Sequence, residues 1–141
     1  MKIYFAGAIR AGRDLQPTYL TIVQHLNRAG HIVLTEHVAD QNVLDDERLT
    51  TEEAIYVQDT AWLDECEAMV AEVTIPSLGV GYEIAYALHK ADKPVLCLCR
   101  QGTHLSAMIL GSTAPRLRVV FYDDVADMLR AVDEFVAALG R

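Results

Sequence analysis

Residues 77–83 combine small residues with a carboxylate, in a pattern that suits anion binding beside acid–base or nucleophilic chemistry. The run begins with Ser77, contains two glycines that would let backbone N–H groups approach an anion closely, and ends with Glu83. It follows a β-prone run at 68–74 and leads into helical spacing of apolar residues over 81–92. The pattern predicts a ligand site at the carboxyl end of a strand, with Glu83 in the first turn of the helix that follows.

The expected position of Glu83 also has a purely structural explanation, because the helix dipole favours an acid in a first turn by about 0.3–1 kcal/mol. Two common phosphate-binding signatures are absent from the sequence. A dinucleotide fingerprint would need a third glycine where the chain has Ile84. Gly7 and Gly12 have the spacing of P-loop glycines, but Arg13 and the aspartate after it replace the Lys-Ser/Thr pair, which argues against an ATPase.

A second carboxylate, Asp59, interrupts the apolar stripe of a helix expected at 51–66. The other positions of that stripe are Ile55, Trp62 or Leu63, and Cys66. An ionised carboxylate among them is costly without partners, so the side chain is protonated, paired, or lines a polar cavity. A structural hydrogen bond is one explanation. Because such groups cluster at functional sites, we favour a site residue.

Two further candidates follow the first two expected strands, 2–6 and 31–38. Arg10 lies in a Gly-rich turn and could pair with a phosphate in bidentate fashion; the alternative is a solvated loop arginine. His37 lies at the end of the second strand, where ligands gather in open α/β sheets, although a histidine there is often only a loop residue. The polar, acidic segment 39–50 shows no periodicity and is expected to cover a pocket.

Composition limits the classes of function. A chain of 141 residues that is 52% hydrophobic suits one globular domain over residues 1–141. A net charge of −8 and a pI near 4.9 argue against binding a nucleic-acid polymer, so an anionic ligand must be held by local groups. Cys66, Cys97 and Cys99 are expected to be free thiols in a reducing cytosol. The first residues fit neither a signal peptide nor a membrane span, and we expect a cytoplasmic protein.

Strands alternate with helices, and most strands are too apolar to face water, which predicts an α/β fold with a parallel sheet covered on both sides. Right-handed crossovers then bring 4–10, His37 and 77–83 to one crevice beside Asp59. The strands are expected at 2–6, 31–38, 68–74, 94–99 and 118–122, and the helices at about 15–28, 51–66, 81–92 and 123–139, with a short apolar helix or turn at 105–111.

Two acids in one crevice, with no metal-ligand spacing, suggest glycosyl chemistry through an oxocarbenium-like transition state. In a retaining mechanism the two carboxyl groups lie about 5–5.5 Å apart. Glu83 would be the nucleophile, and Asp59, its proton affinity raised by burial, would be the acid acting on the leaving base. Tyr4 could donate a hydrogen bond that orients Glu83. Neither a metal nor an organic cofactor is implied.

The chain resembles a known family in blocks that together span nearly its whole length: YFAGAIR at 4–10, EHV at 36–38, QD and WL within 58–63, AEVT at 71–74, PSLGVGYE at 76–83 and LSAMI at 105–109. These blocks are similar to the 2′-deoxynucleoside 5′-monophosphate N-hydrolases, relatives of the nucleoside 2-deoxyribosyltransferases. The resemblance implies a flavodoxin-like or Rossmann-like fold, with a doubly wound sheet of five parallel strands flanked by helices.

The resemblance also implies roles for individual residues. Glu83 would form a deoxyribosyl-enzyme intermediate, Asp59 would act as the acid toward the base, and Tyr4 would position Glu83. Ser106, with Met108 close by, would reach the 5′-phosphate from the neighbouring subunit of a homodimer. The full set of implied substrate-binding residues is Gly7, Ile9, Arg10, His37, Ser77, Gly79, Ser106 and Met108. The chain departs from the family at Ala8, where a serine is frequent, and so lacks that hydroxyl.

We therefore expect hydrolysis of the N-glycosidic bond of 2′-deoxynucleoside 5′-monophosphates to a free base and 2-deoxyribose 5-phosphate. Ser77 favours a phosphorylated substrate, because relatives that act on unphosphorylated nucleosides carry near this position an acid that would repel phosphate. Three alternatives stay open: base exchange onto a second nucleobase, hydrolysis of ribonucleotides such as CMP, and a sensor that binds nucleotides without cleaving them.

Overall fold

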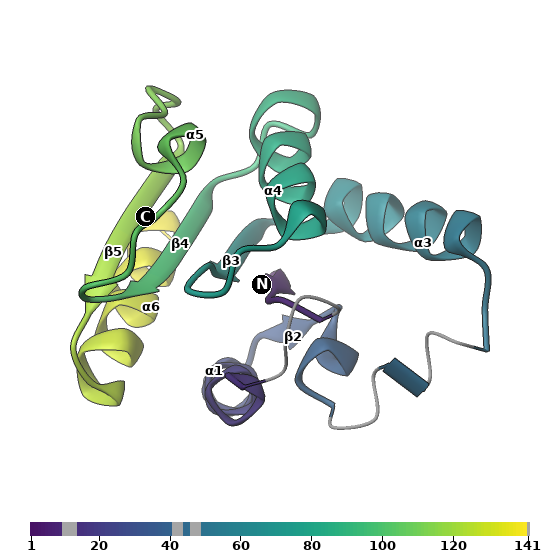
Figure 1. Ribbon diagram of the computed structural model, residues 1–141. Helices are drawn as coiled ribbons and strands as arrows, with labels where there is room; N and C mark the ends of the chain where they lie inside the picture. Colours follow the sequence, from purple (N-terminus) through teal and green to yellow (C-terminus); the bar gives the residue numbers. More distant parts are fainter. Residues whose placement is uncertain (10–13, 41–43, 46–48, 141) are drawn as a thin grey trace.

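The computed structural model describes residues 1–9, 14–40, 44–45 and 49–140 (Figure 1). Arg10 and parts of the segment 39–50 therefore lie outside the described residues. The strands are β1 (Lys2–Ala6), β2 (Ile32–Val33), β3 (Ala68–Glu72), β4 (Val95–Arg100) and β5 (Leu117–Tyr122). The helices are α1 (Gln16–Arg28), the 3-10 helix η1 (Glu36–Ala39), α3 (Glu52–Glu65), α4 (Leu78–Ala85), the π-helical η2 (Tyr86–Lys90), α5 (Ala107–Leu110) and α6 (Val125–Leu139).

The strands form one five-stranded parallel sheet in the order β2-β1-β3-β4-β5. This is the order of flavodoxin-like folds, and it confirms the predicted doubly wound sheet. The chain moves outward from β1 to β2 and then returns past β1 to β3, so the order reverses between β1 and β3. In open α/β sheets, ligands bind outside the carboxyl ends of the strands at such a reversal.

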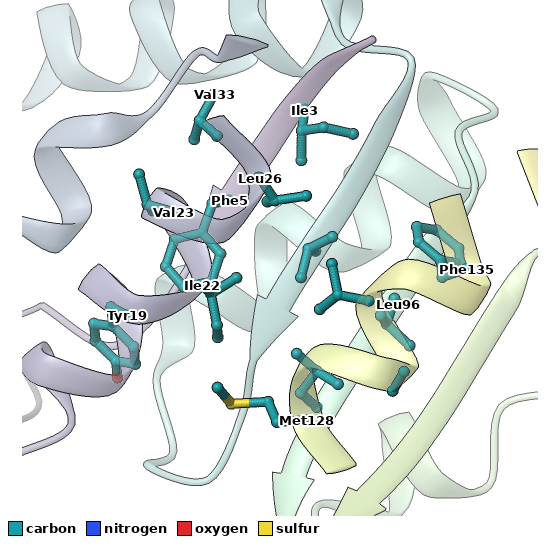
Figure 2. Close-up of a cluster of buried hydrophobic side chains, with 14 of the residues drawn as sticks. Ile3, Phe5, Tyr19, Ile22, Val23, Leu26, Val33, Leu96, Met128 and Phe135 are labelled. Carbon is teal, nitrogen blue, oxygen red and sulfur yellow. The ribbon is translucent and has the colours of Figure 1, made fainter. Parts of the chain in front are cut away.

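One face of the sheet packs against α1 and α6 (Figure 2). Ile3 and Phe5 of β1 join Ile22 of α1 and Met128 of α6 in one buried cluster. The rings of Phe5 and Tyr19 meet edge to face, with centroids 5.7 Å apart. Each fully buried side chain of this kind contributes about 1.5–3 kcal/mol relative to an exposed one. This cluster therefore holds β1 firmly in the centre of the fold.

The opposite face packs against α3 and α4. Tyr4 of β1 lies in this second cluster with Leu63 of α3 and Ile84 of α4. Successive side chains of a strand point to opposite faces, so the side chain of Tyr4 lies on the opposite side of the sheet from its neighbours in β1. The alternation along β1 thereby directs Tyr4 toward the two helices that carry Asp59 and Glu83.

The predicted strand 31–38 is wrong in length, because β2 ends at Val33 and the chain then enters η1. The side chain of Thr35 explains the difference. Its hydroxyl donates to the carbonyl oxygen of Phe5 at 2.6 Å and accepts from the amide of Phe5 at 2.8 Å. The side chain thereby replaces the backbone hydrogen bonds that a longer strand would form. His37 consequently lies in a 3-10 helix and not at a strand end.

The helix predicted over 81–92 begins earlier, at Leu78. The hydroxyl of Ser77 accepts a hydrogen bond from the amide of Val80 at 3.3 Å and caps the helix, which offsets the low helix propensity of the glycines that follow. Glu83 is the sixth residue of α4, so its expected position in the first turn is wrong. The effect of the helix dipole falls off within the first turn, and it does not explain this acid.

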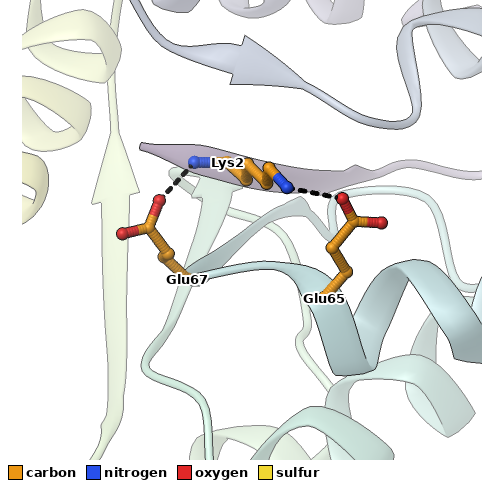
Figure 3. A network of polar contacts seen from close by, with 3 residues as sticks. All are labelled: Lys2, Glu65 and Glu67. Atoms are coloured by element: carbon orange, nitrogen blue, oxygen red, sulfur yellow. Dashed lines mark hydrogen bonds and ion pairs between the residues drawn. The ribbon is translucent and has the colours of Figure 1, made fainter.

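The amino end of β1 is tied to its neighbours by Lys2 (Figure 3). The amide of Lys2 donates to the carboxylate of Glu67 at 2.7 Å, and its Nζ contacts Glu65 at 2.7 Å. The side chains of Lys2 and Glu65 are each 46% exposed, so solvent screens this ion pair and it adds little to stability. These contacts lie at the end of β1 opposite to the carboxyl rim.

The cysteines are free thiols and all are buried, as the sequence predicts: Cys66, Cys97 and Cys99. Burial raises the pKa of Cys66 to about 11 and the pKa of Cys97 to about 12, so both stay protonated. Within the described ranges, we find no helix with the length and apolar character needed to cross a membrane.

Candidate active site

Tyr4, Asp59 and Glu83 come from three different elements and meet near the reversal in strand order. Tyr4 is 2% exposed, whereas Asp59 of α3 and Glu83 of α4 are half-buried. Burial raises the pKa of the Tyr4 phenol, and the charges of Glu83 and Asp59 and a hydrogen bond to Glu83 raise it further. Tyr4 therefore stays protonated at neutral pH and donates its hydroxyl proton to Glu83. The structure thus brings together the three residues that the sequence singles out for catalysis.

The helices that carry the two carboxylates are fixed against each other by tyrosines. The hydroxyls of Tyr56 on α3 and Tyr82 on α4 lie 3.5 Å apart, and their rings meet edge to face with centroids 6.2 Å apart. The hydroxyl of Tyr86 in η2 donates to the two carboxylate oxygens of Asp64 on α3, at 3.0 Å and 3.2 Å. Along each helix, the catalytic carboxylate lies between the two residues that make these contacts. The separation of the two carboxylates is therefore set by helix packing.

An aromatic pair adjoins Asp59. The rings of His37 and Trp62 have centroids 5.6 Å apart and an interplanar angle of 40°. Trp62 lies three residues after Asp59, on the same face of α3, and both aromatic side chains are half-buried. His37 also lines a groove of about 430 Å³ between α1 and η1. His37 is thus held beside the cluster through Trp62, and the pair offers a surface on which a planar ring could stack.

The start of α4 has open space above its glycines. A Cβ added to Gly79 would meet only the hydroxyl of Ser77, at 3.9 Å, and one added to Gly81 would meet nothing within 4 Å. Neither glycine has a positive φ, so the backbone would accept alanine at both positions. Glycine within a helix costs roughly 0.5–1 kcal/mol relative to alanine. Packing within the described chain does not explain why glycine is present at these positions. A ligand or partner that approaches the backbone closely would explain it.

Gly7, by contrast, is required by packing. A Cβ on Gly7 would lie 2.6 to 2.9 Å from ring atoms of Tyr19. The hydroxyl of Tyr19 also accepts a hydrogen bond from the amide of Ala8 at 3.0 Å. Ile9 follows and packs against the cluster on the α1 and α6 side. Tyr19 thus fixes the path of the chain as it leaves β1, a role that the glycine spacing alone does not indicate.

Ser106 and Met108 lie at α5, between β4 and β5. The hydroxyl of Ser106 accepts from the amide of Met108 at 3.2 Å and caps this short helix. Leu105 and Ile109 pack inward against the cluster on the α3 and α4 side. Ser106 and Met108 are exposed, the methionine by 83%. An exposed methionine beside an exposed serine is compatible with a surface that meets another chain.

The aromatic contacts around the carboxylates, His37 with Trp62 and Tyr56 with Tyr82, were not predicted from the sequence. The spacing of Trp62, three residues after Asp59, was an available signal, because such residues share one face of a helix. The contact between Tyr56 and Tyr82 joins positions 26 residues apart, and no local pattern reveals such a pairing.

The cluster is suited to chemistry at a sugar carbon. A phenol donates to one carboxylate, and a second carboxylate lies close by, which is an arrangement for a nucleophilic step and an acid–base step. Within the part of the chain that the structure describes, no group of three or more His, Cys, Asp or Glu residues is placed to hold a metal ion.

Comparisons with known proteins agree with the resemblance seen in the sequence. A family model described as "Nucleoside 2-deoxyribosyltransferase" matches residues 3–139. A protein of Methanosarcina barkeri, provisionally named 2′-deoxynucleoside 5′-phosphate N-hydrolase 1, is 44% identical over 138 residues, which cover 98% of this chain and 86% of that protein. A Rattus norvegicus protein named 5-hydroxymethyl-dUMP N-hydrolase is 49% identical over 114 residues, which cover 78% of this chain and 69% of that protein.

A solved structure shares the fold. The CMP N-glycosidase of Clostridium botulinum matches with a TM-score of 0.70 and 18% identity, over 96% of this chain and 99% of that chain. At this identity the likeness concerns the fold alone. The family model covers nearly the whole sequence, and two relatives are 44% and 49% identical to it; the protein belongs to the nucleoside 2-deoxyribosyltransferase family.

Proposed function

We propose that this protein hydrolyses the N-glycosidic bond of 2′-deoxynucleoside 5′-monophosphates, releasing a free base and 2-deoxyribose 5-phosphate. The observation that carries the proposal is the hydrogen bond from buried Tyr4 to Glu83, with Asp59 beside it. The names of the relatives in Methanosarcina barkeri and Rattus norvegicus support the same reaction class. The proposal treats residues 1–141 as one catalytic domain in the cytoplasm, a location that suits three buried free thiols.

The reaction follows in two balanced steps. A carboxylate oxygen of Glu83 bonds to C1′ while the bond from C1′ to the base nitrogen breaks, and Asp59 gives a proton to the departing base. Water then attacks C1′, Asp59 takes the proton of that water, and the bond from C1′ to Glu83 breaks. Tyr4 keeps its proton throughout and orients Glu83. The ring pair of His37 and Trp62, next to Asp59, is placed to contact the base.

The phosphate end of the substrate is assigned to the segments that follow β1 and β3. Ser77 and Gly79 stand at the capped start of α4, where open space lies above the glycine. Gly7, Ile9 and Arg10 belong to the other segment, of which Arg10 lies outside the described residues. The amides at a helix start suit a phosphate group in a protein whose net charge is −8.

The proposal includes a homodimer in which Ser106 and Met108 of one subunit reach the phosphate in the other. Three features support a partner surface: the exposure of both residues, the inward packing of their neighbours Leu105 and Ile109, and the open space at Gly81.

Product analysis tests the reaction itself. Incubation with dGMP alone should release guanine and 2-deoxyribose 5-phosphate, measured by chromatography, and added adenine should form little dAMP. Release of guanine only when adenine is present, together with formation of dAMP, would instead establish base exchange. Binding of dGMP without release of base under either condition would indicate a nucleotide sensor. Faster cleavage of CMP than of dCMP would assign the activity to ribonucleotides.

The Tyr4→Phe variant tests the contact that carries the proposal. It removes one hydroxyl from a buried ring, and we expect kcat to fall roughly 100-fold with little change in KM. The lost donor stabilised the ionised carboxylate of Glu83, so the acid limb of the kcat/KM profile should move to higher pH.

The unfolding temperature shows whether the Tyr4→Phe variant is folded, and its pH profile shows whether the hydroxyl positions Glu83. A folded variant with wild-type kcat and an unchanged acid limb would show that the hydroxyl does not position Glu83. Thr21→Val is the control, because it removes one hydroxyl from α1, which packs on the opposite side of the sheet from Tyr4.

Mixed dimers test the shared site. Subunits carrying Ser106→Ala or Glu83→Ala are coexpressed with different tags and purified through both tags. One of the two sites then combines an intact Glu83 with an intact Ser106, and roughly half of the wild-type activity should return. Activity of the mixed dimer that only equals the average of the two parent dimers would count against a Ser106 contribution across subunits.

A further inference from the structure

Glu72 is a fully buried acid that the proposed reaction does not use. It is the last residue of β3 and is 0% exposed. Its neighbours Met69 and Ala71 in β3 belong to the cluster on the α3 and α4 side, whereas Ala68 and Val70 belong to the opposite cluster. By the same alternation the Glu72 side chain lies on the α1 and α6 side of the sheet, opposite to that of Tyr4.

The carboxylate of Glu72 is surrounded by donors. One oxygen accepts from the amide of Thr74 at 2.6 Å, and the other accepts from the hydroxyl of Thr74 at 2.9 Å and from the hydroxyl of Tyr122. The oxygen of the Thr74 hydroxyl itself accepts from the amide of Arg100 at 3.0 Å, so its proton is directed at Glu72. Burial and the carboxylate of Glu72 raise the pKa of Tyr122, which therefore also remains a donor. An ionised carboxylate satisfies all of these groups.

These bonds connect the carboxyl ends of three strands. Glu72 ends β3, Arg100 ends β4 and Tyr122 ends β5. Glu72 and Arg100 bond to Thr74 directly, and Tyr122 bonds to Glu72. Thr74 lies three residues before Ser77, the cap of α4. The segment that leads to the start of α4 is thereby attached at two atoms of Thr74, the amide nitrogen and the hydroxyl oxygen.

Stability alone does not require this arrangement. Burying a charge costs several kcal/mol, and a well-packed apolar residue in place of a buried charge is often neutral or stabilising. The β3 residues that precede Glu72 on this side of the sheet, Ala68 and Val70, are apolar. An apolar residue could not, however, hold the amide and the hydroxyl of Thr74 at the same time. What the carboxylate supplies is a defined position for the segment before Ser77.

We propose that Glu72, Thr74 and Tyr122 are positioning residues that hold the β3–α4 segment in the geometry in which Ser77 and Gly79 bind the 5′-phosphate. The inference rests on the proposed function and adds a second group of residues to it, on the opposite side of the sheet from the catalytic carboxylates. Because the group acts on the phosphate end, its loss should weaken substrate binding more than it slows bond cleavage.

The experiment compares Thr74→Val with Thr74→Ser. The side chain of valine has the shape of threonine but can neither donate to Glu72 nor accept from Arg100, whereas serine keeps the hydroxyl. With dGMP as substrate, we expect Thr74→Val to raise KM about tenfold with kcat within about threefold, and Thr74→Ser to keep KM within about twofold of the wild-type value. Inorganic phosphate should also inhibit Thr74→Val less strongly than the wild-type protein.

A loss of kcat at unchanged KM, or an equal rise in KM for Thr74→Val and Thr74→Ser, would overturn the inference. If Thr74→Val does not fold, Tyr122→Phe provides the test, because it leaves both bonds of Thr74 to Glu72 in place and should raise KM in the same direction by a smaller factor. An unchanged KM in folded Tyr122→Phe would then overturn the inference. A wild-type protein that releases no base would defeat the proposed function itself, which is a different result from any of these.

Discussion

The hydrogen bond from Tyr4 to Glu83 is the contact on which the site depends. Tyr4 belongs to a central strand that pairs with neighbours on both sides, so its hydroxyl has a fixed position. Glu83 is brought to it by α4, and Asp59 is brought beside both by α3. Both carboxylates act on the Tyr4 phenol, and such a pair suits a division of roles in which one attacks and the other carries a proton.

The topology explains why the site lies where it does. The strand order reverses between β1 and β3, and in open α/β sheets ligands bind at the carboxyl ends of the strands at such a reversal. The chain leaves β3 through a short segment whose cap, Ser77, starts α4, and the same helix delivers Glu83 in its second turn. One element therefore carries both the expected phosphate contact and the nucleophile. The tyrosine contacts between α3 and α4 keep that element at a set distance from Asp59.

Much of this arrangement could be predicted from the sequence, because it depends on local patterns and on general rules of connection. Apolar runs and helical periodicity indicated β1, β3 and α3, and right-handed crossovers placed their ends at one rim. One error came from a tertiary contact that no local pattern contains, because Thr35 replaces part of the β2 ladder. The other concerned a local signal: Ser77 caps the helix, which therefore begins before the two glycines. The role of Trp62 and the buried bonds of Glu72 likewise depend on partners distant in the chain.

The central claim is that Glu83 forms the bond to C1′, and the rate of base release by the Glu83→Ala variant tests it most directly. The account predicts a loss of several orders of magnitude in kcat, with binding of the deoxynucleotide retained in calorimetry and with the wild-type unfolding temperature largely preserved. Glu53→Ala, which removes an exposed acid from α3, is the matched control and should keep its activity. Base release by Glu83→Ala at the wild-type rate would contradict the account.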